Sequence, residues 1–147
     1  MIGWKIKELF FDRQAVLGRV DAATRKVLSR FGAFVRQAAR SSIRTRKKSS
    51  EPGQPPSSHT GLLKKFIFFG YEPDRRSVVI GPVRLSEKGR GEAPSILEYG
   101  GTAHLRQGSG GQATKSKRVR IQPRPFMTPA FEKEQPKLPA MWHDSIK

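Results

Sequence analysis

Hydrophobic residues recur with the spacing of an α-helix along a long N-terminal stretch of the chain. Between Arg13 and about Arg46, apolar residues are three or four positions apart, and most Arg and Lys residues fall on the opposite side of the helical wheel. The apolar positions are Val16, Val20, Ala23, Val27, Phe31, Phe34 and Ala38. Asp12 directly precedes them and is typical of an N-cap. The pattern predicts one long amphipathic helix over residues 12–46, with its apolar stripe packed on a core.

Shorter patterns predict strands on either side of this helix. Residues 3–10 alternate imperfectly between apolar and polar side chains, which indicates an N-terminal strand within 1–11. Residues 66–71 and 77–81 are rich in aromatic and β-branched side chains and flank a polar turn, which predicts a hairpin. A short helical turn before this hairpin completes the segment 61–83.

Loops and short elements are expected over the rest of the chain. The segment 47–60 has no apolar periodicity and is predicted to be a flexible loop. Residues 84–122 are predicted to contain loops, a short helix at 93–99 that ends at a Gly-Gly pair, and a strand at 117–122. The stretch 104–116 is rich in Gly, Ser and Gln and is expected to be a second long flexible loop.

The C-terminal segment 123–147 is expected to be a proline-rich joint followed by helices. Pro125 stands close to the start of the first of these helices, and Pro136 and Pro139 break or restart the helical pattern. The combined pattern predicts a single α+β domain over residues 1–147. In it the long helix packs on an antiparallel sheet of about four strands, the C-terminal helices pack alongside, and two long loops remain.

Composition narrows the classes of partner. The chain has 29 Lys and Arg against 12 Asp and Glu, a net charge of +17 over 147 residues. A field of this size favours polyanions or acidic protein surfaces, with a soluble basic surface that has no specific partner as the alternative. The absence of cysteine excludes disulfides and thiolate metal sites. No apolar run approaches the ~20 residues of a membrane span and no signal-peptide pattern is present, so we expect a soluble protein of cytoplasmic origin without a membrane partner.

Signatures of enzymatic chemistry are missing from the sequence. The three histidines are widely separated, and neither a Gly-x-Ser-x-Gly elbow nor a phosphate-binding loop is present. Glu98 is the one acid in an apolar, structured neighbourhood, and Arg124 is its candidate ion-pair partner. A catalytic Glu98 is the weaker alternative. We therefore expect no enzymatic activity, no metal and no cofactor.

Basic residues form two groups that point to a polyanion or an acidic partner. Residues 12–48 carry eleven basic and two acidic side chains, and residues 104–124 carry six basic side chains and no acid. Such segments can follow a phosphate backbone without reading bases. The candidate contact residues are Arg36, Arg40, Arg44, Arg106, Lys115, Lys117, Arg118 and Arg120.

Two late motifs are the most informative stretches. Leu-Glu-Tyr-Gly-Gly-Thr spans residues 97–102, and Pro-Arg-Pro-Phe-Met-Thr-Pro-Ala spans residues 123–130. They follow the long helix, a Thr-Gly-Leu-Leu at 60–63 and a Val-Ile-Gly-Pro at 79–82. This order resembles the tail-completion, or minor tail, proteins of long-tailed bacteriophages, which join the tail to the neck of the filled head. The resemblance covers about residues 10–135.

The resemblance implies a structural virion protein without catalysis. It implies an α+β protomer in a ring, commonly sixfold, between the head connector and the tail tube, present in the host cytoplasm during assembly. Its partners would be further copies of itself and the tail-tube, tail-terminator and head-connector or stopper proteins. The residues expected at subunit or partner contacts are Glu98, Tyr99, Gly100, Gly101, Thr102, Arg124, Pro125, Phe126, Met127 and Phe131.

Three alternatives stay open at this point. The Arg-Pro-Phe segment is either a subunit contact or only an intramolecular joint between a strand and a helix. The basic segments face either genomic DNA in the lumen or an acidic neighbouring ring. Outside the phage assignment, the rival function is a stand-alone basic protein that binds nucleic acid without sequence preference.

Overall fold

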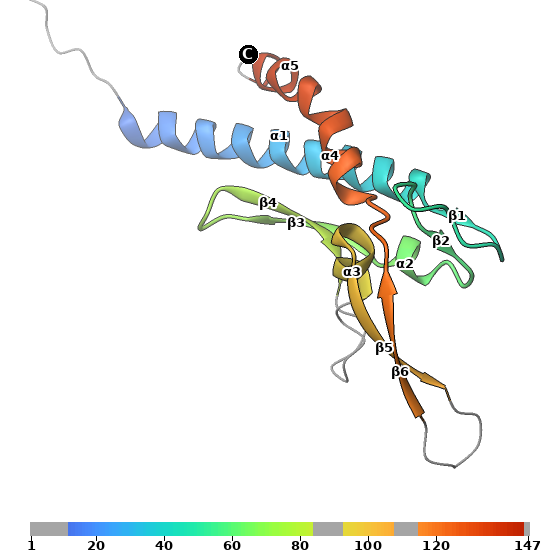
Figure 1. Cartoon of the computed structure of the whole chain (residues 1–147). Helices are drawn as coiled ribbons and strands as arrows, with labels where there is room; N and C mark the ends of the chain where they lie inside the picture. The colour runs from blue at the N-terminus through green and yellow to red at the C-terminus, as the bar shows by residue number, and fades with distance from the viewer. Residues whose placement is uncertain (1–11, 84–92, 108–114, 146–147) are drawn as a thin grey trace, which may run out of the picture.

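A long helix lies at the centre of the structure, and the other elements pack along it. The computed structural model describes residues 12–83, 93–107 and 115–145. One hairpin follows one side of the long helix, the C-terminal helices cross another side, and a second hairpin projects away (Figure 1). The helices are α1 (Arg13–Ser42), α2 (Leu62–Lys65), α3 (Ala93–Tyr99), α4 (Met127–Glu134), η1 (Gln135–Lys137) and α5 (Leu138–His143). The predicted α+β class is confirmed.

The long helix begins where the sequence predicts and ends earlier than expected. Asp12 is the N-cap, and its Oδ1 accepts the backbone N–H of Ala15 at 3.0 Å. The helix ends at Ser42. The next residue, Ile43, has an extended backbone, and its side chain is buried. Arg44–Thr45 (β1) then pairs in parallel with Ser57–Ser58 (β2). The predicted continuation to residue 46 is therefore wrong.

The first hairpin matches its prediction and packs closely on α1. Strands β3 (Ile67–Glu72) and β4 (Ser77–Pro82) are antiparallel. A Cβ placed on Gly32 of α1 would lie 2.8 Å from Val78 and 2.9 Å from Phe69. Glycine at this position is what allows the hairpin to approach the helix so closely.

The second hairpin corrects the prediction of a long loop over residues 104–116. Strand β5 (Gly101–Gln107) pairs antiparallel with β6 (Lys115–Ile121), so residues 104–107, 115 and 116 are extended and paired. Gly100 adopts φ 77° and Gly101 φ 153° directly after α3, which redirects the chain into β5.

These four longer strands do not form one sheet. The described strands make three separate two-stranded sheets: β1–β2, β3–β4 and β5–β6. The predicted strand within 1–11 and the predicted loop over 84–92 lie outside the described residues. The expectation of a shared four-stranded sheet was wrong because alternation predicts a strand without specifying its partner.

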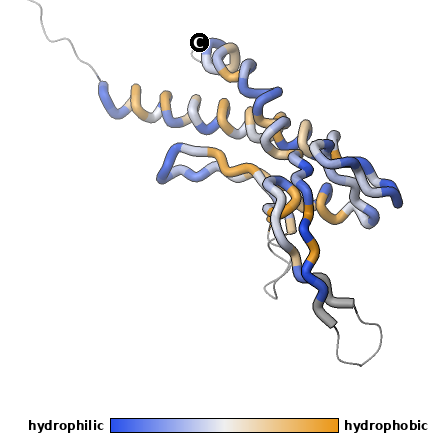
Figure 2. Tube along the Cα trace, in the orientation of Figure 1, coloured by the Kyte–Doolittle hydropathy of each residue, from blue (hydrophilic) through white to orange (hydrophobic). Residues whose placement is uncertain are grey.

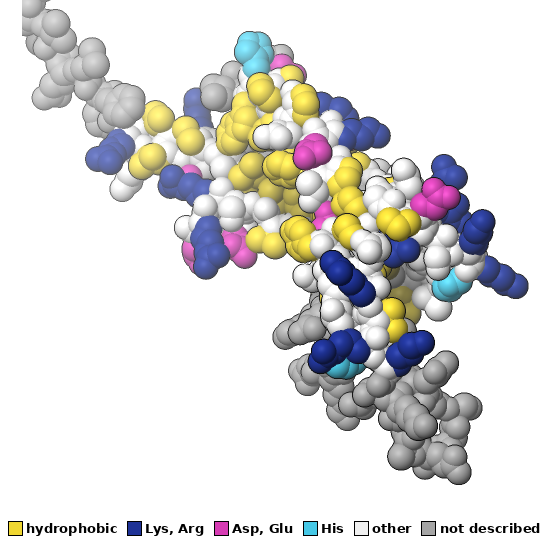
Figure 3. Space-filling model, viewed as in Figure 1, with side chains coloured by type: hydrophobic (Ala, Val, Ile, Leu, Met, Phe, Trp, Pro, Cys, Tyr) yellow, Lys and Arg dark blue, Asp and Glu magenta, His cyan; other side chains and the backbone are white. Residues whose placement is uncertain are grey.

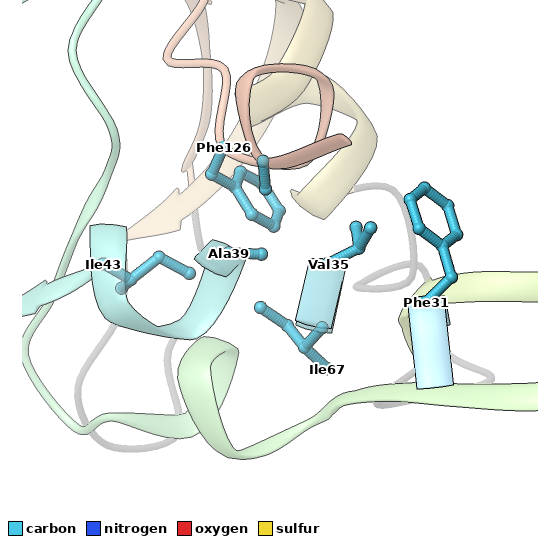
Figure 4. Packing of buried hydrophobic residues seen from close by; sticks show 7 residues of the cluster. Phe31, Val35, Ala39, Ile43, Ile67 and Phe126 are labelled. Carbon is cyan, nitrogen blue, oxygen red and sulfur yellow. The ribbon is translucent and has the colours of Figure 1, made fainter. Parts of the chain in front are cut away.

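The core is small and lies at the C-terminal half of α1. It is built by α1, its C-cap, β3, α4 and the proline-rich joint, which is the segment 122–126 between β6 and α4. Its residues are Phe31, Val35, Ala39, Ile43, Ile67, Phe126 and Ala130 (Figure 4). The apolar stripe continues along α1 towards its N-terminus (Figure 2). There, however, Val16, Leu17 and Val20 are exposed. The stripe is thus covered from Val27 onwards, apart from Phe34, which is 38% exposed.

Candidate functional site

Glu98 joins the two late motifs by capping a helix from a distance. Its Oε2 accepts the backbone N–H groups of Phe126 and Met127 at 2.8 and 3.0 Å, and its Oε1 accepts that of Thr128 at 2.8 Å. The first N–H groups of a helix have no acceptor within that helix. Phe126 occupies the N-cap position of α4 and provides no side-chain acceptor. Glu98, from α3, supplies it instead.

The environment of the carboxylate keeps it ionised. Burial by itself would raise the pKa of Glu98, but the backbone N–H groups of Met127, Phe126 and Thr128, with the Thr128 hydroxyl, outweigh burial and lower the pKa below its ordinary value. The N-terminal end of α4 also favours a negative charge. Only 7% of Glu98 is exposed, so it is an acceptor inside the fold.

Arg124 does not pair with Glu98, so that predicted ion pair is wrong. Its Nε donates to the carbonyl of Ser50 at 3.0 Å, and its backbone N–H donates to the carbonyl of Leu97 at 2.6 Å. The guanidinium therefore holds the segment that follows α1 against the joint. The carboxylate of Glu98 instead accepts three backbone donors from the N-cap and first turn of α4.

The segment 47–60 is attached to the joint, which corrects its prediction as a flexible loop. The backbone N–H of Gly53 donates to the carbonyl of Pro123 at 2.9 Å. Ser50 and Ser58 are buried. The polar composition of this segment hid these contacts because they run through backbone atoms, and we find no sequence signal that would have located them.

The motif residues divide into internal and outward-facing groups. Phe126 is buried, and Pro125 and Met127 are half-buried, so they belong to the strand-to-helix joint within this chain. Tyr99 is 77% exposed and Phe131 is 43% exposed. The Phe131 ring also packs edge-on against Phe31, which lies in α1, with ring centroids 5.6 Å apart.

The glycine pair of the first motif serves as a turn next to the second motif. A Cβ at Gly100 would lie 3.1 Å from Cδ of Pro123 and 3.2 Å from the carbonyl of Ile121. Its positive φ also disfavours other residues. Gly101 and Thr102 follow as exposed positions of β5.

The predicted basic residues fall on different parts of the structure. Arg36 is used internally, because its Nε donates to the carbonyl of Ile67 at 2.7 Å and its guanidinium lies over the Phe68 ring. Arg40 is half-buried, whereas Arg44 is exposed. The second hairpin projects away from α1 and β1, the elements that carry these three residues (Figure 1).

The second hairpin collects most of the other predicted cations. Thr102 is opposite Arg120, and His104 is opposite Arg118, so these four exposed residues share one face. Lys117, also exposed, is on the other face. Arg106 and Lys115 occupy register positions nearer the hairpin tip. Figure 3 shows Lys and Arg side chains on this projecting arm.

A basic pocket beside the end of α1 was not anticipated. It has a volume of about 550 Å³, and its lining includes Arg44, Arg46 and Lys48 together with the acidic Glu51. The sequence signal for this pocket is the basic run over residues 44–48, which the apolar and polar pattern divides between the predicted helix and the following loop.

Neither a metal site nor a membrane-spanning helix is found in the described residues, and comparison with known proteins adds no assignment. In the described part of the chain, no group of three or more His, Asp or Glu side chains is placed to hold a metal ion. None of the described helices has the length and apolarity needed to cross a membrane. Searches against family models, curated proteins and solved structures found no match.

Proposed function

We propose that this chain is a structural virion protein that completes a bacteriophage tail, forming a ring between the head connector and the tail tube. The proposal starts from the order of motifs along the sequence, which resembles that of tail-completion proteins. It assigns the chain no catalysis and no cofactor.

One observation carries the proposal: the two motifs behind the resemblance meet in space and build a joint. Glu98 from the first motif caps α4, which begins within the second motif. Arg124 of the second motif binds the segment after α1. These contacts fix α3, α4 and the segment after α1 relative to one another. A ring subunit needs such a rigid framework to hold its contact surfaces in place.

The outward-facing parts supply the expected contacts. Tyr99 and Phe131 expose aromatic surface beside the joint, and aromatic residues are enriched at the centres of protein interfaces. The projecting basic hairpin would face DNA in the lumen or an acidic neighbouring ring. In this proposal the head-connector or stopper protein, the tail terminator and the tail tube are the neighbours.

The test is native mass spectrometry of the purified chain with and without its candidate tail-tube protein. A discrete ring, alone or on the tube, is the expected result. A chain that stays monomeric in both conditions contradicts the proposal.

A second function is favoured by a separate observation, the charge of the second hairpin. Residues 99–131 contain no acid, and Arg118 and Arg120 share an exposed face of the arm. The alternative is a protein that binds nucleic acid without sequence preference. It predicts tight binding to random duplex DNA that weakens steeply with salt.

A matched pair of variants separates the two functions. Arg118→Glu with Arg120→Glu reverses two charges on the hairpin, and Arg25→Glu with Lys26→Glu makes the same charge change at exposed positions of α1. If DNA binding is the function, the hairpin variant loses far more affinity than the α1 variant. Equal losses would mean that only net charge matters, and ring formation with negligible DNA binding favours tail completion.

A further inference from the structure

The free end of α1 carries an apolar surface that the fold leaves exposed. Val16, Leu17 and Val20 are 42%, 43% and 48% exposed, and their spacing places them on one face of the helix, here called the helix stripe. Arg13, three positions before Val16, lies on the same face. Figure 3 shows hydrophobic side chains, with Lys and Arg between them, at this end of α1.

The first hairpin has a second exposed apolar surface, on the side turned away from α1. Phe68, Val79 and Val83 are 46%, 56% and 49% exposed and are here called the outer sheet face. Gly81 is opposite Phe68, and Gly70 is opposite Val79, so this face has small residues between its large ones. Exposed large apolar side chains gathered on one sheet face are typical of a binding site.

The sequence of the hairpin supports a covered outer face. Phe66–Phe69 and Val78–Ile80 are continuous apolar runs without polar alternation. Such runs are typical of strands covered on both faces, whereas a strand with one solvated face alternates. Among the described residues, α1 packs on the inner face of β3–β4 and reaches the outer face only through Arg36, whose guanidinium lies over the Phe68 ring. Within residues 12–83, 93–107 and 115–145, most of the outer face therefore lacks the partner that its sequence predicts.

The chain already shows what kind of element such a surface accepts. The inner face of the hairpin packs on α1, with Val78 and Phe69 closely approaching Gly32. The helix stripe belongs to the same helix and has the same apolar character. It cannot reach the outer face within one protomer, because the Asp21–Arg76 ion pair (3.2 Å) places the hairpin turn beside α1 after the stripe has ended.

Charge favours contact between the stripe and the sheet face over contact between two stripes. Two helix stripes facing each other would bring together Arg13 from both copies. The outer sheet face instead offers Glu72, which shares the parity of Phe68 and Gly70 in β3 and has 46% of its side chain exposed. Glu72 also lies 4.0 Å from Arg75, but both side chains are exposed, so its carboxylate stays accessible to Arg13 of another copy.

We propose that copies of this chain associate head to tail, with the helix stripe of one copy packing on the outer sheet face of the next. Because the two surfaces differ, the contact is heterologous and repeats from copy to copy, closing into a ring where the rotation permits. This inference rests on the proposed function and deepens it by naming the surfaces that form the ring.

Two variants of the full chain test the inference. The helix variant carries Leu17→Lys with Val20→Lys, and the sheet variant carries Val79→Lys; all three positions are exposed, and circular dichroism checks that folding is retained. Native mass spectrometry, with the tail-tube protein where the ring requires it, should show that each variant alone loses the oligomer. Ala15→Lys, exposed on the opposite side of the helix, should keep it.

Mixing the variants gives the decisive result. The helix variant keeps an intact sheet face and the sheet variant keeps an intact stripe, so an equimolar mixture should form a 1:1 heterodimer and nothing larger. The introduced residues are all Lys, so they cannot attract one another across the mixture.

The opposing outcomes are distinct. No heterodimer in the mixture overturns the head-to-tail contact, as does a homodimer of the sheet variant alone, which would mean that two stripes pair. A wild-type ring that both variants still form overturns this inference and leaves the proposed function standing. A wild-type chain that stays monomeric, alone and with the tube, overturns both.

Discussion

Replacing Glu98 tests whether the carboxylate that joins the two motifs stabilises the fold through its charge. Glu98→Gln preserves shape but leaves one oxygen, which can accept two of the three N–H groups from Phe126, Met127 and Thr128. Hydrogen bonds to a charged group contribute about 1.5–3 kcal/mol each. The loss of one such bond and of the charge on the others gives an expected loss of about 2 kcal/mol in unfolding free energy.

Glu98→Ala should be more damaging because it leaves all three donors without their acceptor. Phe126 is 1% exposed, so water cannot replace the bond to its N–H, whereas Thr128 is exposed and can recover part of the loss. We expect a loss of about 4 kcal/mol. Urea denaturation followed by circular dichroism at pH 7 measures both values. Glu132→Gln removes an exposed acid from the same helix and should change stability by less than about 0.5 kcal/mol.

The pH dependence provides a second check. The pKa of Glu98 is lower in the folded chain than its ordinary value of 4.5, so its contribution is fully present above that value and is lost as the pH falls through the folded pKa. The difference between wild type and Glu98→Gln should be constant from neutral pH down to about pH 6 and shrink in acid. An equal difference at pH 3 and pH 7, or none at pH 7, would refute the capping argument.

Two further predictions concern small side chains. Gly18→Ala should stabilise the protein by up to about 1 kcal/mol, because alanine favours the helix and nothing lies within 4 Å of the new Cβ. Gly32→Ala should destabilise the protein by more than this gain, because the new Cβ would clash with Val78 and Phe69. Thermal unfolding of both variants measures the contrast, and equal effects would contradict the close approach of the hairpin to α1. The hydroxyl of Ser50 is buried and has no hydrogen-bond partner among the described residues, so Ser50→Ala should stabilise by about 1 kcal/mol in urea denaturation, and a loss of stability would show that the hydroxyl makes a contact.

Local patterns in the sequence determined the elements whose cause is local. The period of α1, its cap at Asp12, the hairpin around residues 73–76 and the helix ended by Gly100 all follow from spacing, capping and turn chemistry among near neighbours. The two late motifs stand out in the sequence, and of the two interpretations of the Arg-Pro-Phe segment the structure shows an intramolecular joint.

Only the tertiary structure decided how these elements meet. A carboxylate such as Glu98 can pair with an arginine or cap a helix, and its choice depended on three backbone donors brought 28 to 30 residues along the chain to its side. Backbone contacts likewise fixed residues 50–53, because main-chain groups carry no sequence signature. The pairing of strands into separate hairpins, and the exposure of the first half of the apolar stripe, depend on where other elements lie. Periodicity determines which side of an element is apolar; only packing determines whether the chain itself covers that side.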